Sequence, residues 1–416
     1  MSRVPGGRED RLPFAHVGRL LLVCCGALLP SIVSAGSLQE LLAEVELEAS
    51  VATVLQRIDR NGTEEDRSQA RLNYRGDLAA TLTLHRPGDG AGSVHGHVRF
   101  GQGAGVRPRP LYTGAVNSLA FGPDSPGDSF AILAQLYYHL EYPLGGASAT
   151  GGQRFEFTAG KIDPFGFFDQ NAVADDESTA FLNNIFVHNA LLDSGGDLGA
   201  GRYGFTPGLR AGWYDGTGRN VGWGASAGLF GAGSAADFSG SPQRPFLIAQ
   251  FELSPKRVSG EPRGTFRLYR WTNPQAENFD GVQERHDGWG LSADHQVGTA
   301  LNLFGRYGRR LRGHGEFDEV LTLGLEIAGT SWGRADDAVG LAAGRLETDK
   351  VYASAGNEGQ AAGFASGAEK IVEVFYRLAL GRHVQLSADL QFLRHPRGDP
   401  TAATTRVAGI RARIGV

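Results

Sequence analysis

The feature that most constrains this chain is an alternation of apolar and polar residues with a period of two, repeated in segments of roughly ten residues. In one such segment the apolar side is Ile132, Ala134, Leu136, Tyr138, Leu140 and Tyr142, and the polar side is Gln135, Tyr137, His139 and Glu141. Successive side chains of a strand point to opposite faces. Each segment therefore predicts a strand with one apolar and one polar face.

The alternation recurs along almost the whole chain. Clear segments lie at residues 45–51, 71–82, 94–100, 132–142, 289–296, 321–327, 372–380, 384–392 and 408–416, and weaker ones at 153–160, 207–214, 221–230, 246–253, 264–271, 300–307 and 338–346. Together they predict sixteen strands, an even number that is usual for bacterial outer-membrane barrels. A barrel of that size encloses an aqueous channel.

The distribution of charge distinguishes such a barrel from a soluble sandwich or propeller. Glu, Arg, His and Asp gather on one face of the segments, whereas the other face is almost free of charge. A charge that faces the middle of a bilayer costs ~2–4 kcal/mol, so a clean apolar face suits lipid. The sequence predicts an all-β fold, a transmembrane antiparallel β-barrel of about 16 strands in contact with outer-membrane lipid.

Residues 1–35 have the pattern of a secretory signal peptide. Arginines precede a short apolar run over residues 20–29, and Val33-Ser34-Ala35 supplies small residues before a cleavage site after Ala35. The run is too short to span a bilayer, although an inner-membrane anchor is the alternative interpretation. We therefore expect residues 36–416 to form the barrel.

Removal of the leader also removes both cysteines, Cys24 and Cys25. The exported chain then offers no disulfide and no Cys-ligated metal site. It keeps 36 basic and 43 acidic residues, a formal charge of −7. This mildly acidic balance is unfavourable for binding nucleic acid.

Residues 161–206 interrupt the alternation and are rich in aromatic and acidic residues. A long irregular stretch in a compact barrel is usually functional. Acidic residues at 175–177 precede apolar residues spaced three and four apart at 181–186, which predicts a short helix with its N-terminus near the acids. We expect this segment to fold into the lumen as a constriction loop, because its apolar side chains need a surface to pack on.

The same segment resembles the carbohydrate-selective porin family (OprB type). The resembling motifs are GKIDPFGFFDQN (160–171), DDE (175–177), FLNN (181–184), FVHN (186–189), LDSGGD (192–197) and YGFTPG (203–208), with QARLNYRG (69–76) and GWGLS (288–292) elsewhere. The resemblance implies a barrel, monomeric or a homotrimer, in the outer membrane of a Gram-negative bacterium. It also implies passive diffusion of mono- and oligosaccharides.

A sugar channel needs hydrogen-bond donors and acceptors together with aromatic surfaces, and it must bind weakly enough to release its solute. The predicted pore-lining and sugar-contacting residues are Glu44, Glu46, Glu48, Arg71, Asn73, Arg75, His97 and Arg99. The candidates in the constriction loop are Lys161, Asp163, Phe165, Phe167, Phe168, Asp169, Asn171, Asp175, Asp176, Glu177, Asn183, His188 and Asn189. The alternative roles are structural: ion pairs across the wall, and phenylalanines that anchor the loop.

Other functions have weaker signals. The sequence GASAG at 224–228 matches the G-x-S-x-G nucleophile pattern of an outer-membrane barrel lipase or esterase, but it lies inside an alternating segment. Asp193 and Asp197 are candidates for calcium, although a turn explains them better. An export channel for an acidic polysaccharide would need a cationic lumen, and a plugged structural barrel would not conduct. We expect no cofactor, no metal and no enzymatic activity.

Overall fold

The computed structural model describes residues 45–58, 69–85, 90–108, 112–120, 128–144, 152–240, 243–355 and 367–416. Glu44 and the predicted signal peptide lie outside the described residues. Residues 1–45 group separately from residues 46–416, so the barrel is described by itself.

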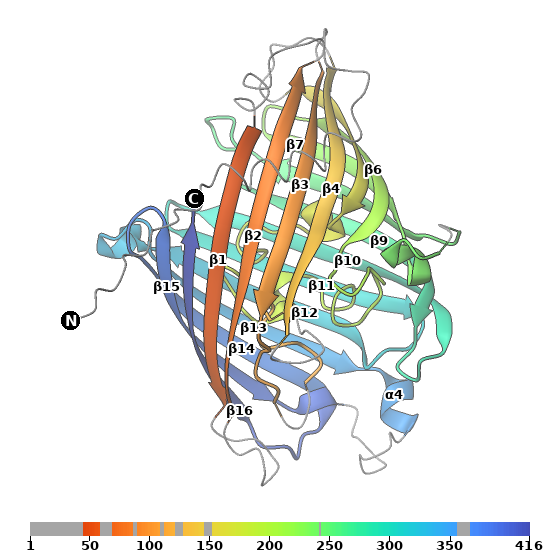
Figure 1. The fold of residues 1–416 in the computed structure, drawn as a ribbon, viewed down its shortest axis with the longest axis vertical. Coiled ribbons are helices and arrows are strands. Elements are labelled where there is room, and N and C mark those ends of the chain that lie inside the picture. The colour runs from red at the N-terminus through yellow and green to blue at the C-terminus, as the bar shows by residue number, and fades with distance from the viewer. Residues whose placement is uncertain are drawn as a thin grey trace, which may run out of the picture. The chain divides into compact units, whose positions relative to one another are not determined.

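Sixteen strands form one closed antiparallel barrel, in which each strand pairs with its neighbours in sequence and β1 pairs with β16 (Figure 1). The strands are β1 (Val45–Ile58), β2 (Gln69–His85), β3 (Ala91–Gln102), β4 (Ser129–Leu144), β5 (Gln153–Ile162), β6 (Thr206–Asp215), β7 (Val221–Phe230), β8 (Phe246–Pro255), β9 (Gly264–Glu277), β10 (Gln283–Val297), β11 (Leu301–Arg312), β12 (Phe317–Ala328), β13 (Ala338–Thr348), β14 (Ala368–Ala379), β15 (Val384–Arg394) and β16 (Thr405–Gly415). The predicted fold class and strand number are confirmed.

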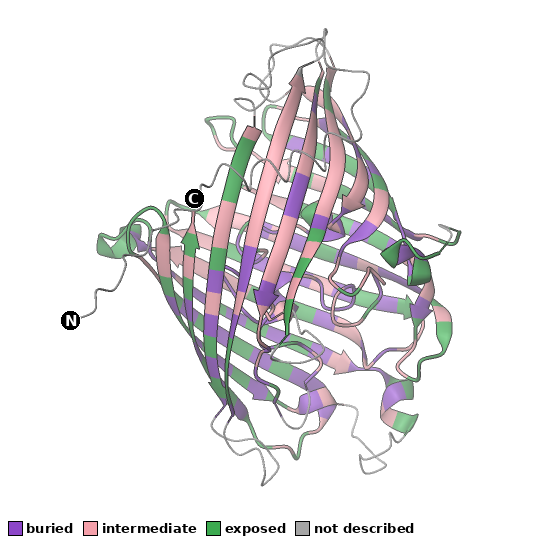
Figure 2. Cartoon of the chain, viewed as in Figure 1, coloured by how far each residue is buried: buried purple, intermediate pink, exposed green. Residues whose placement is uncertain are grey.

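The exposure of side chains follows the predicted alternation. Every second residue of β7 is buried and the others are exposed, and the same banding runs along β13, β14, β15 and β16 (Figure 2). In the middle of these strands the exposed set is apolar, as in Leu341, Val374 and Leu390. The outward face therefore offers lipid an apolar surface, whereas the buried set faces the lumen.

Inward-facing glycines make room for inward-facing aromatic rings on the neighbouring strands. A Cβ placed on Gly288 would lie 2.1 Å from the ring of Trp271, and one on Gly290 would lie 2.5 Å from Tyr269. Gly288 is the direct partner of Trp271 in the β9–β10 pairing, and Gly290 is the direct partner of Tyr269. The glycine-rich composition, 61 residues in all, thus serves in part to pack large side chains flat against the wall.

The helices in the described residues are short. They are η2 (Pro164–Gly166), α3 (Asn184–Val187), η3 (Gly233–Asp237), η4 (Gly329–Trp332), α4 (Lys350–Ala355) and η5 (Pro396–Gly398). No helix in the described ranges has the length and apolar character to cross a bilayer.

The predicted position of the short helix, directly after the acidic residues at 175–177, is wrong. Asp176 accepts hydrogen bonds from Ser178 N at 2.8 Å and Thr179 Oγ1 at 2.8 Å, which closes a turn there. The helix α3 begins only at Asn184, where Asn183 Oδ1 accepts from Ile185 N at 3.3 Å. At Asp176 the same kind of side-chain contact is followed only by a single turn, in which Ala180 N donates to Asp176 O at 2.8 Å.

The two ends of the barrel differ in their connections. At one end lie the start of β1 and the finish of β16, with tight links such as residues 298–300 between β10 and β11. At the other end lie the longer links, including residues 103–128 and 163–205. We call these the terminal end and the long-connection end. In outer-membrane barrels the longer connections face outside the cell.

Candidate pore constriction

Residues 163–205, which join β5 to β6, contact inward side chains from strands around the whole barrel. We call them the β5–β6 segment. Their hydrogen-bond and ion-pair partners include Arg75 on β2, Gln250 on β8, Tyr269 on β9, Arg306 on β11 and Glu373 on β14. Because these partners lie on opposite sides of the closed barrel, the segment lies inside it.

The first anchor of this segment is Asp169, which is fully buried. Its carboxylate accepts hydrogen bonds from Tyr269 Oη at 2.7 Å and Asn189 N at 2.6 Å, and Arg306 Nε lies 3.1 Å away. Arg306 also donates to the carbonyls of Ala174 and Phe186. One buried guanidinium thereby joins three separated points of the segment to β11.

Asp197 forms a second anchor. Its carboxylate accepts from Trp271 Nε1 at 3.0 Å and from Arg310 Nη2 at 2.8 Å, and His286 Nδ1 lies 2.8 Å away. Burial raises the pKa of Asp197, but the charge of Arg310 and the hydrogen bond from His286 outweigh it, so the pKa is lowered. The carboxylate is therefore held ionised and paired with the wall.

The third anchor joins the segment to β14 and β16. Glu373 accepts hydrogen bonds from Leu182 N at 2.5 Å and Asn183 N at 2.9 Å. Arg411 Nη1 donates to the carbonyls of Glu177 at 2.7 Å and Ala180 at 2.8 Å. Buried backbone groups that would otherwise have no partner are thus satisfied by wall side chains.

Part of the lumen is filled by packed aromatic side chains. Phe181 of the segment lies 5.4 Å from the ring of Phe304 and 5.0 Å from that of Phe375, and Phe168 lies 5.9 Å from Phe230. Each such buried ring contributes roughly 1.5–3 kcal/mol relative to exposure to water. The apolar side chains of the segment thus pack on the arc of wall that carries these aromatic residues.

A second inward segment, residues 112–120 between β3 and β4, was not foreseen. Ser118 N donates to Leu182 O at 2.8 Å, and Asn184 N donates to Ala115 O at 3.0 Å. Gln56 Nε2 and Gln391 Nε2 both donate to Val116 O at 2.9 Å. This stretch therefore lies between the β5–β6 segment and the wall near β1 and β15.

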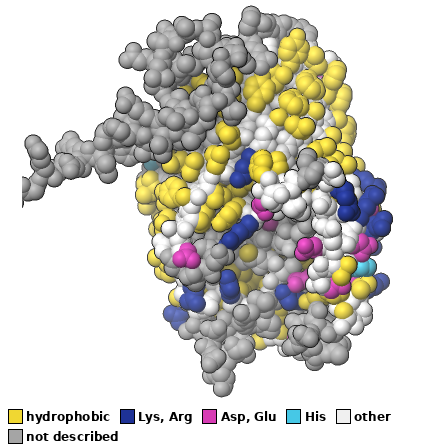
Figure 3. All heavy atoms as spheres, turned by 45° about the vertical axis from the view of Figure 1, so that its right-hand side comes forward, with side chains coloured by type: hydrophobic (Ala, Val, Ile, Leu, Met, Phe, Trp, Pro, Cys, Tyr) yellow, Lys and Arg dark blue, Asp and Glu magenta, His cyan; other side chains and the backbone are white. Residues whose placement is uncertain are grey.

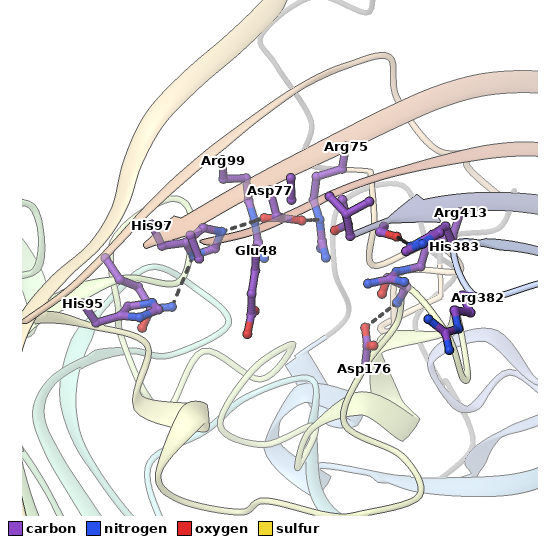
Figure 4. Close-up of a pocket in the computed structure, with 17 residues that line it drawn as sticks. Glu48, Arg75, Asp77, His95, His97, Arg99, Asp176, Arg382, His383 and Arg413 are labelled. Atoms are coloured by element: carbon purple, nitrogen blue, oxygen red, sulfur yellow. Dashed lines mark hydrogen bonds and ion pairs between the residues drawn. The ribbon is translucent and has the colours of Figure 1, made fainter. Parts of the chain in front are cut away.

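Two cavities remain open beside this packing. The first, about 690 Å³, lies towards the terminal end and is lined by Glu48, Asp77, His95, His97, Arg382, His383 and Arg413 among others (Figure 4). The second, about 510 Å³, is lined by Asp163, Phe165, Asp175, Glu177, His188, Tyr203 and Phe205 among others. Arg75, Arg99 and Asp176 line both cavities. We call the place where they meet the constriction.

At the constriction, arginines of the wall face acidic residues of the segment. Arg75 pairs with Glu177 and with Asp77, whose Oδ2 is 3.0 Å from Arg75 Nε. Arg99 Nε lies 2.6 Å and His97 Nε2 lies 2.8 Å from Asp77 Oδ1 (Figure 4). The constriction therefore offers guanidinium hydrogen-bond donors and carboxylate acceptors side by side.

Aromatic rings lie next to the polar groups of the constriction. The Arg99 guanidinium lies 5.4 Å from the ring centre of Phe205, and Tyr203 stacks on Phe130 at 5.6 Å. The rings of Phe165 and His188 stack at 3.9 Å with only 3° between their planes. The second cavity therefore combines ring faces with hydrogen-bonding groups.

Burial shifts the acidity of several groups in the segment. It raises the pKa of Asp163 to about 6, that of Asp193 to about 7, and that of Asp175 well above its ordinary value. Burial and the charge of Arg306 lower the pKa of His188 to about 3. Burial alone would raise the pKa of Glu177, but Arg75 and Arg99 lower it overall. The segment is therefore a mixture of ionised and protonatable carboxyls.

The sequence profile of the family described as "Carbohydrate-selective porin, OprB family" matches residues 133–415. This chain belongs to that family. The match spans β5 to β16 in full and most of β4, so it includes the whole β5–β6 segment. Among curated proteins, none matches the sequence.

Solved structures share the fold of this porin at low sequence identity. OprB of Pseudomonas putida at high pH is 17% identical, with a TM-score of 0.67 over 91% of this chain and 96% of that chain. An anion-selective porin from Comamonas acidovorans is 12% identical, with a TM-score of 0.56 over 89% of this chain and 99% of that chain. Family and fold together support the function of an outer-membrane porin, and they indicate a channel.

The porin structure brings about half of the predicted site residues together around the two cavities. These are Glu48, Arg75, His97, Arg99, Asp163, Phe165, Asp175, Asp176, Glu177 and His188. Glu46 is exposed on β1 but does not line either cavity, and Arg71 is exposed on β2 and donates to Ala70 O at 3.1 Å.

Several other predicted residues support the porin structure and do not line the pathway. Asn73 is buried and accepts from Asn117 Nδ2 at 2.8 Å. Phe168, Asp169, Asn171, Asn183 and Asn189 are buried against the wall. Phe167 packs between Tyr137 and Arg210. Sugar stacking on Phe168 is therefore excluded, whereas its structural role agrees with the alternative interpretation.

Lys161 was wrongly assigned to the lumen. It lies in β5, which continues to Ile162, so the connecting segment begins at Asp163. The buried residues of β5 include Glu156 and Thr158, so Lys161 has the opposite parity and faces outward. Its Nζ donates to Leu133 O at 2.8 Å. Gly160, with φ of 148°, lies at this end of the strand, where the regular alternation is harder to extrapolate.

Sequence reasoning missed other residues that line the pathway. Asp77 continues the inward parity of Arg75 on β2, and His95 continues that of His97 on β3, so the period of two could have found both. Tyr203 and Phe205 lie in the YGFTPG motif, but only their three-dimensional position beside Arg99 marks them as a lining.

The signals for other chemistry have structural explanations. Ser226 lies within β7 between its partners on β6 and β8, with its side chain buried and facing inward, and no strand–turn–helix elbow is present there. Asp197 is paired with Arg310, and Asp193 accepts from Asn184 Nδ2 at 3.3 Å. The described residues contain no cluster of His, Cys, Asp or Glu suited to a metal ion.

Proposed function

We propose that this porin passes mono- and oligosaccharides through the two cavities, and that the constriction between them sets the selectivity. The observation that carries the proposal is the meeting of Arg75 and Arg99 with Asp176 and Glu177, beside the ring faces of Tyr203 and Phe205. In this proposal the β5–β6 segment is the constriction loop, because its anchoring to the wall reduces the open cross-section.

A sugar offers hydroxyl groups that both donate and accept, and ring faces that are weakly apolar. The arginines donate to hydroxyl oxygens and the carboxylates accept hydroxyl protons, so each hydrogen bond to water lost on entry has a replacement. Neighbouring charges of both signs prevent a single-sign field, so no group holds a neutral solute tightly. The solute then crosses down its gradient.

The balance of charge in the second cavity disfavours export of an acidic polysaccharide. The second cavity is lined by Arg75, Arg99 and Arg202, against the carboxyl groups of Asp163, Asp175, Asp176, Glu177 and Asp193. A polyanion would meet at least as many acidic as basic groups along this part of the pathway. A neutral solute avoids that repulsion.

Current block by maltose in planar bilayers tests the proposal. Tyr203→Ala removes a ring face from the second cavity, and we expect about twofold to tenfold weaker block, the range for loss of one aromatic contact. Tyr142→Ala is the matched control, because Tyr142 is 45% exposed on the outward face of β4. Equal block in wild type, variant and control would contradict this assignment of the pathway.

Two further parts of the proposal concern the mature protein. We infer export through a leader cleaved after Ala35, supported by the basic, apolar and small-residue order of residues 1–35. We also propose a homotrimer, which the family resemblance suggests. Intact mass of the purified protein tests the first, and its mass in detergent by light scattering tests the second.

A further inference from the structure

A cluster of cations lies on the outward face of the barrel, away from the pathway. It consists of Arg345 on β13, Lys370 on β14, Arg394 on β15 and Arg406 on β16, and we call it the outer cationic patch. All four side chains are exposed. Their strand neighbours Leu346, Ile371, Leu393 and Val407 are buried on the lumen side, so the parity of each strand places the cations outward.

The members of the patch are neighbours across adjacent strands. Lys370 is the direct partner of Arg345 in the β13–β14 pairing and of Arg394 in the β14–β15 pairing. Arg406 is the partner of Phe392, two residues from Arg394 on the same face. Strands lie roughly 4.8 Å apart, so three cations line up over about 10 Å. Like charges directly opposite each other destabilise a sheet.

Carboxylates relieve this repulsion only at one edge of the patch. Arg345 pairs with Glu347. In the described part of the chain, no ion pair joins a carboxylate to Lys370, Arg394 or Arg406. By contrast, Arg309 on the outward face of β11 has its own partner, Glu319, at 3.1 Å. The patch therefore has an excess of positive charge that a ligand from outside the chain could neutralise.

The height of the patch on the wall indicates the kind of ligand. Arg394 is the last residue of β15 and Arg406 the second of β16, so the patch lies at the long-connection end. The next outward residues towards the middle of the wall are apolar, among them Val372 and Phe392. In the face drawn in Figure 3, apolar side chains are densest in the upper part, and most of the charged side chains lie lower. Charge is tolerated on a lipid-facing wall only near the interface, where headgroups lie.

We propose that the outer cationic patch binds the phosphate of an anionic lipid headgroup, in the membrane leaflet that surrounds the long-connection end. A guanidinium presents a planar fork of donors that matches phosphate oxygens, and a lysine adds a compact charge beside it. Three cations within about 10 Å, with Arg406 on the next strand, suit a headgroup with a doubly charged phosphate or two phosphates. The acyl chains then lie against the apolar outward residues below the patch.

Native mass spectrometry of the full protein in detergent tests this, with dioctanoyl phosphatidic acid as the phosphorylated probe and dioctanoyl phosphatidylcholine as the zwitterionic comparison. Each cation near a lipid surface contributes severalfold in affinity, so the double variant Lys370→Gln/Arg394→Gln should bind phosphatidic acid at least about tenfold more weakly than wild type. The matched control is Arg270→Gln, which removes one exposed outward cation of β9, away from the patch. It should stay within about twofold of wild type.

The remaining outcomes also decide the proposal. Equal retention of phosphatidic acid by wild type and the double variant overturns it, as does an equal loss in Arg270→Gln. Displacement of the lipid by inorganic phosphate at the same concentration would mean that the patch binds the phosphate group without a membrane. A lower oligomer mass with unchanged lipid binding would assign the patch to contact between copies of the chain. Unchanged maltose block in the double variant shows that its barrel is intact.

Discussion

Substitution of Arg306 by methionine should release the β5–β6 segment from the wall. Arg306 is 2% exposed and donates to the carbonyl oxygens of Ala174 at 2.7 Å, Phe186 at 2.6 Å and Asp169 at 3.1 Å. It also pairs with the carboxylates of Asp169 at 3.1 Å and Asp175 at 3.3 Å. Methionine has a similar length but provides none of these contacts.

The size of the effect follows from the charge that is left behind. Removal of one partner of a buried ion pair costs ~3–5 kcal/mol, because the other charge stays buried without compensation. Asp169 would keep only its hydrogen bonds from Tyr269 and Asn189. Since about 1.4 kcal/mol is a factor of ten, the population of detached segments should rise by roughly 100-fold to 4,000-fold.

Single-channel recording in planar bilayers measures this release. We expect a larger and noisier current in Arg306→Met, because a detached segment no longer reduces the open cross-section. The matched control is Arg267→Met, since Arg267 pairs with the wall residue Asp294 at 2.9 Å. A variant current equal in size and noise to that of the wild type and the control would refute the role of Arg306 as an anchor.

Three further predictions concern acidity, packing and export. Lowering the pH from 8 to 5 should shift the reversal potential in a salt gradient towards anions, because Asp193 and Asp163, with pKa values of about 7 and 6, lose negative charge while His188, with a pKa of about 3, stays neutral. A constant reversal potential would contradict these pKa values. Gly290→Val should lower the unfolding temperature and raise the current noise, since even the valine Cβ would lie 2.5 Å from the ring of Tyr269. Calorimetry measures the first and single-channel recording the second. If neither changed, the close packing of Tyr269 against Gly290 would be contradicted. The intact mass of the outer-membrane protein should correspond to a chain that begins at Gly36, and a mass that includes Met1 would disprove cleavage.

The alternation of residues predicted the barrel well because the wall separates two solvents. Each residue of β7 or β14 meets either lipid or the lumen, so every position carries information about the fold. Even the weak, glycine-rich segment at 221–230 forms a regular strand, β7 (Val221–Phe230). The number of strands followed from counting segments and is confirmed.

The interior could be predicted only in part, because its contacts join residues far apart in the chain. Arg75 pairs with Glu177, which lies 102 positions later, and no local pattern marks that pair. Residues 112–120 have no periodicity that would place them inside the barrel. The aromatic packing of Phe181 against Phe304 and Phe375 depends on strand register, which the sequence alone does not give.

The predictions for single residues were wrong where the alternation stops. Lys161 was predicted to face the lumen but faces outward, because it lies beside Gly160 at the end of β5, where the alternation is irregular. The acidic residues at 175–177 were predicted to begin a helix, but Asp176 closes a turn there. Asp169 and Asn189 were chosen for their polar side chains, yet both side chains are buried. The Asp169 carboxylate accepts from Tyr269 Oη and from the backbone N of Asn189, and the Asn189 amide donates to Tyr269 Oη. Residue type gives the chemistry available, whereas burial decides whether a solute can reach it.

Passage of sugar through the pore is the central claim, and liposome swelling tests it most directly. Liposomes that contain the purified porin, placed in isotonic glucose or maltose, should swell at a rate that rises with the amount of protein and falls with the size of the sugar. Swelling no faster than that of protein-free liposomes, in both sugars, would contradict the account.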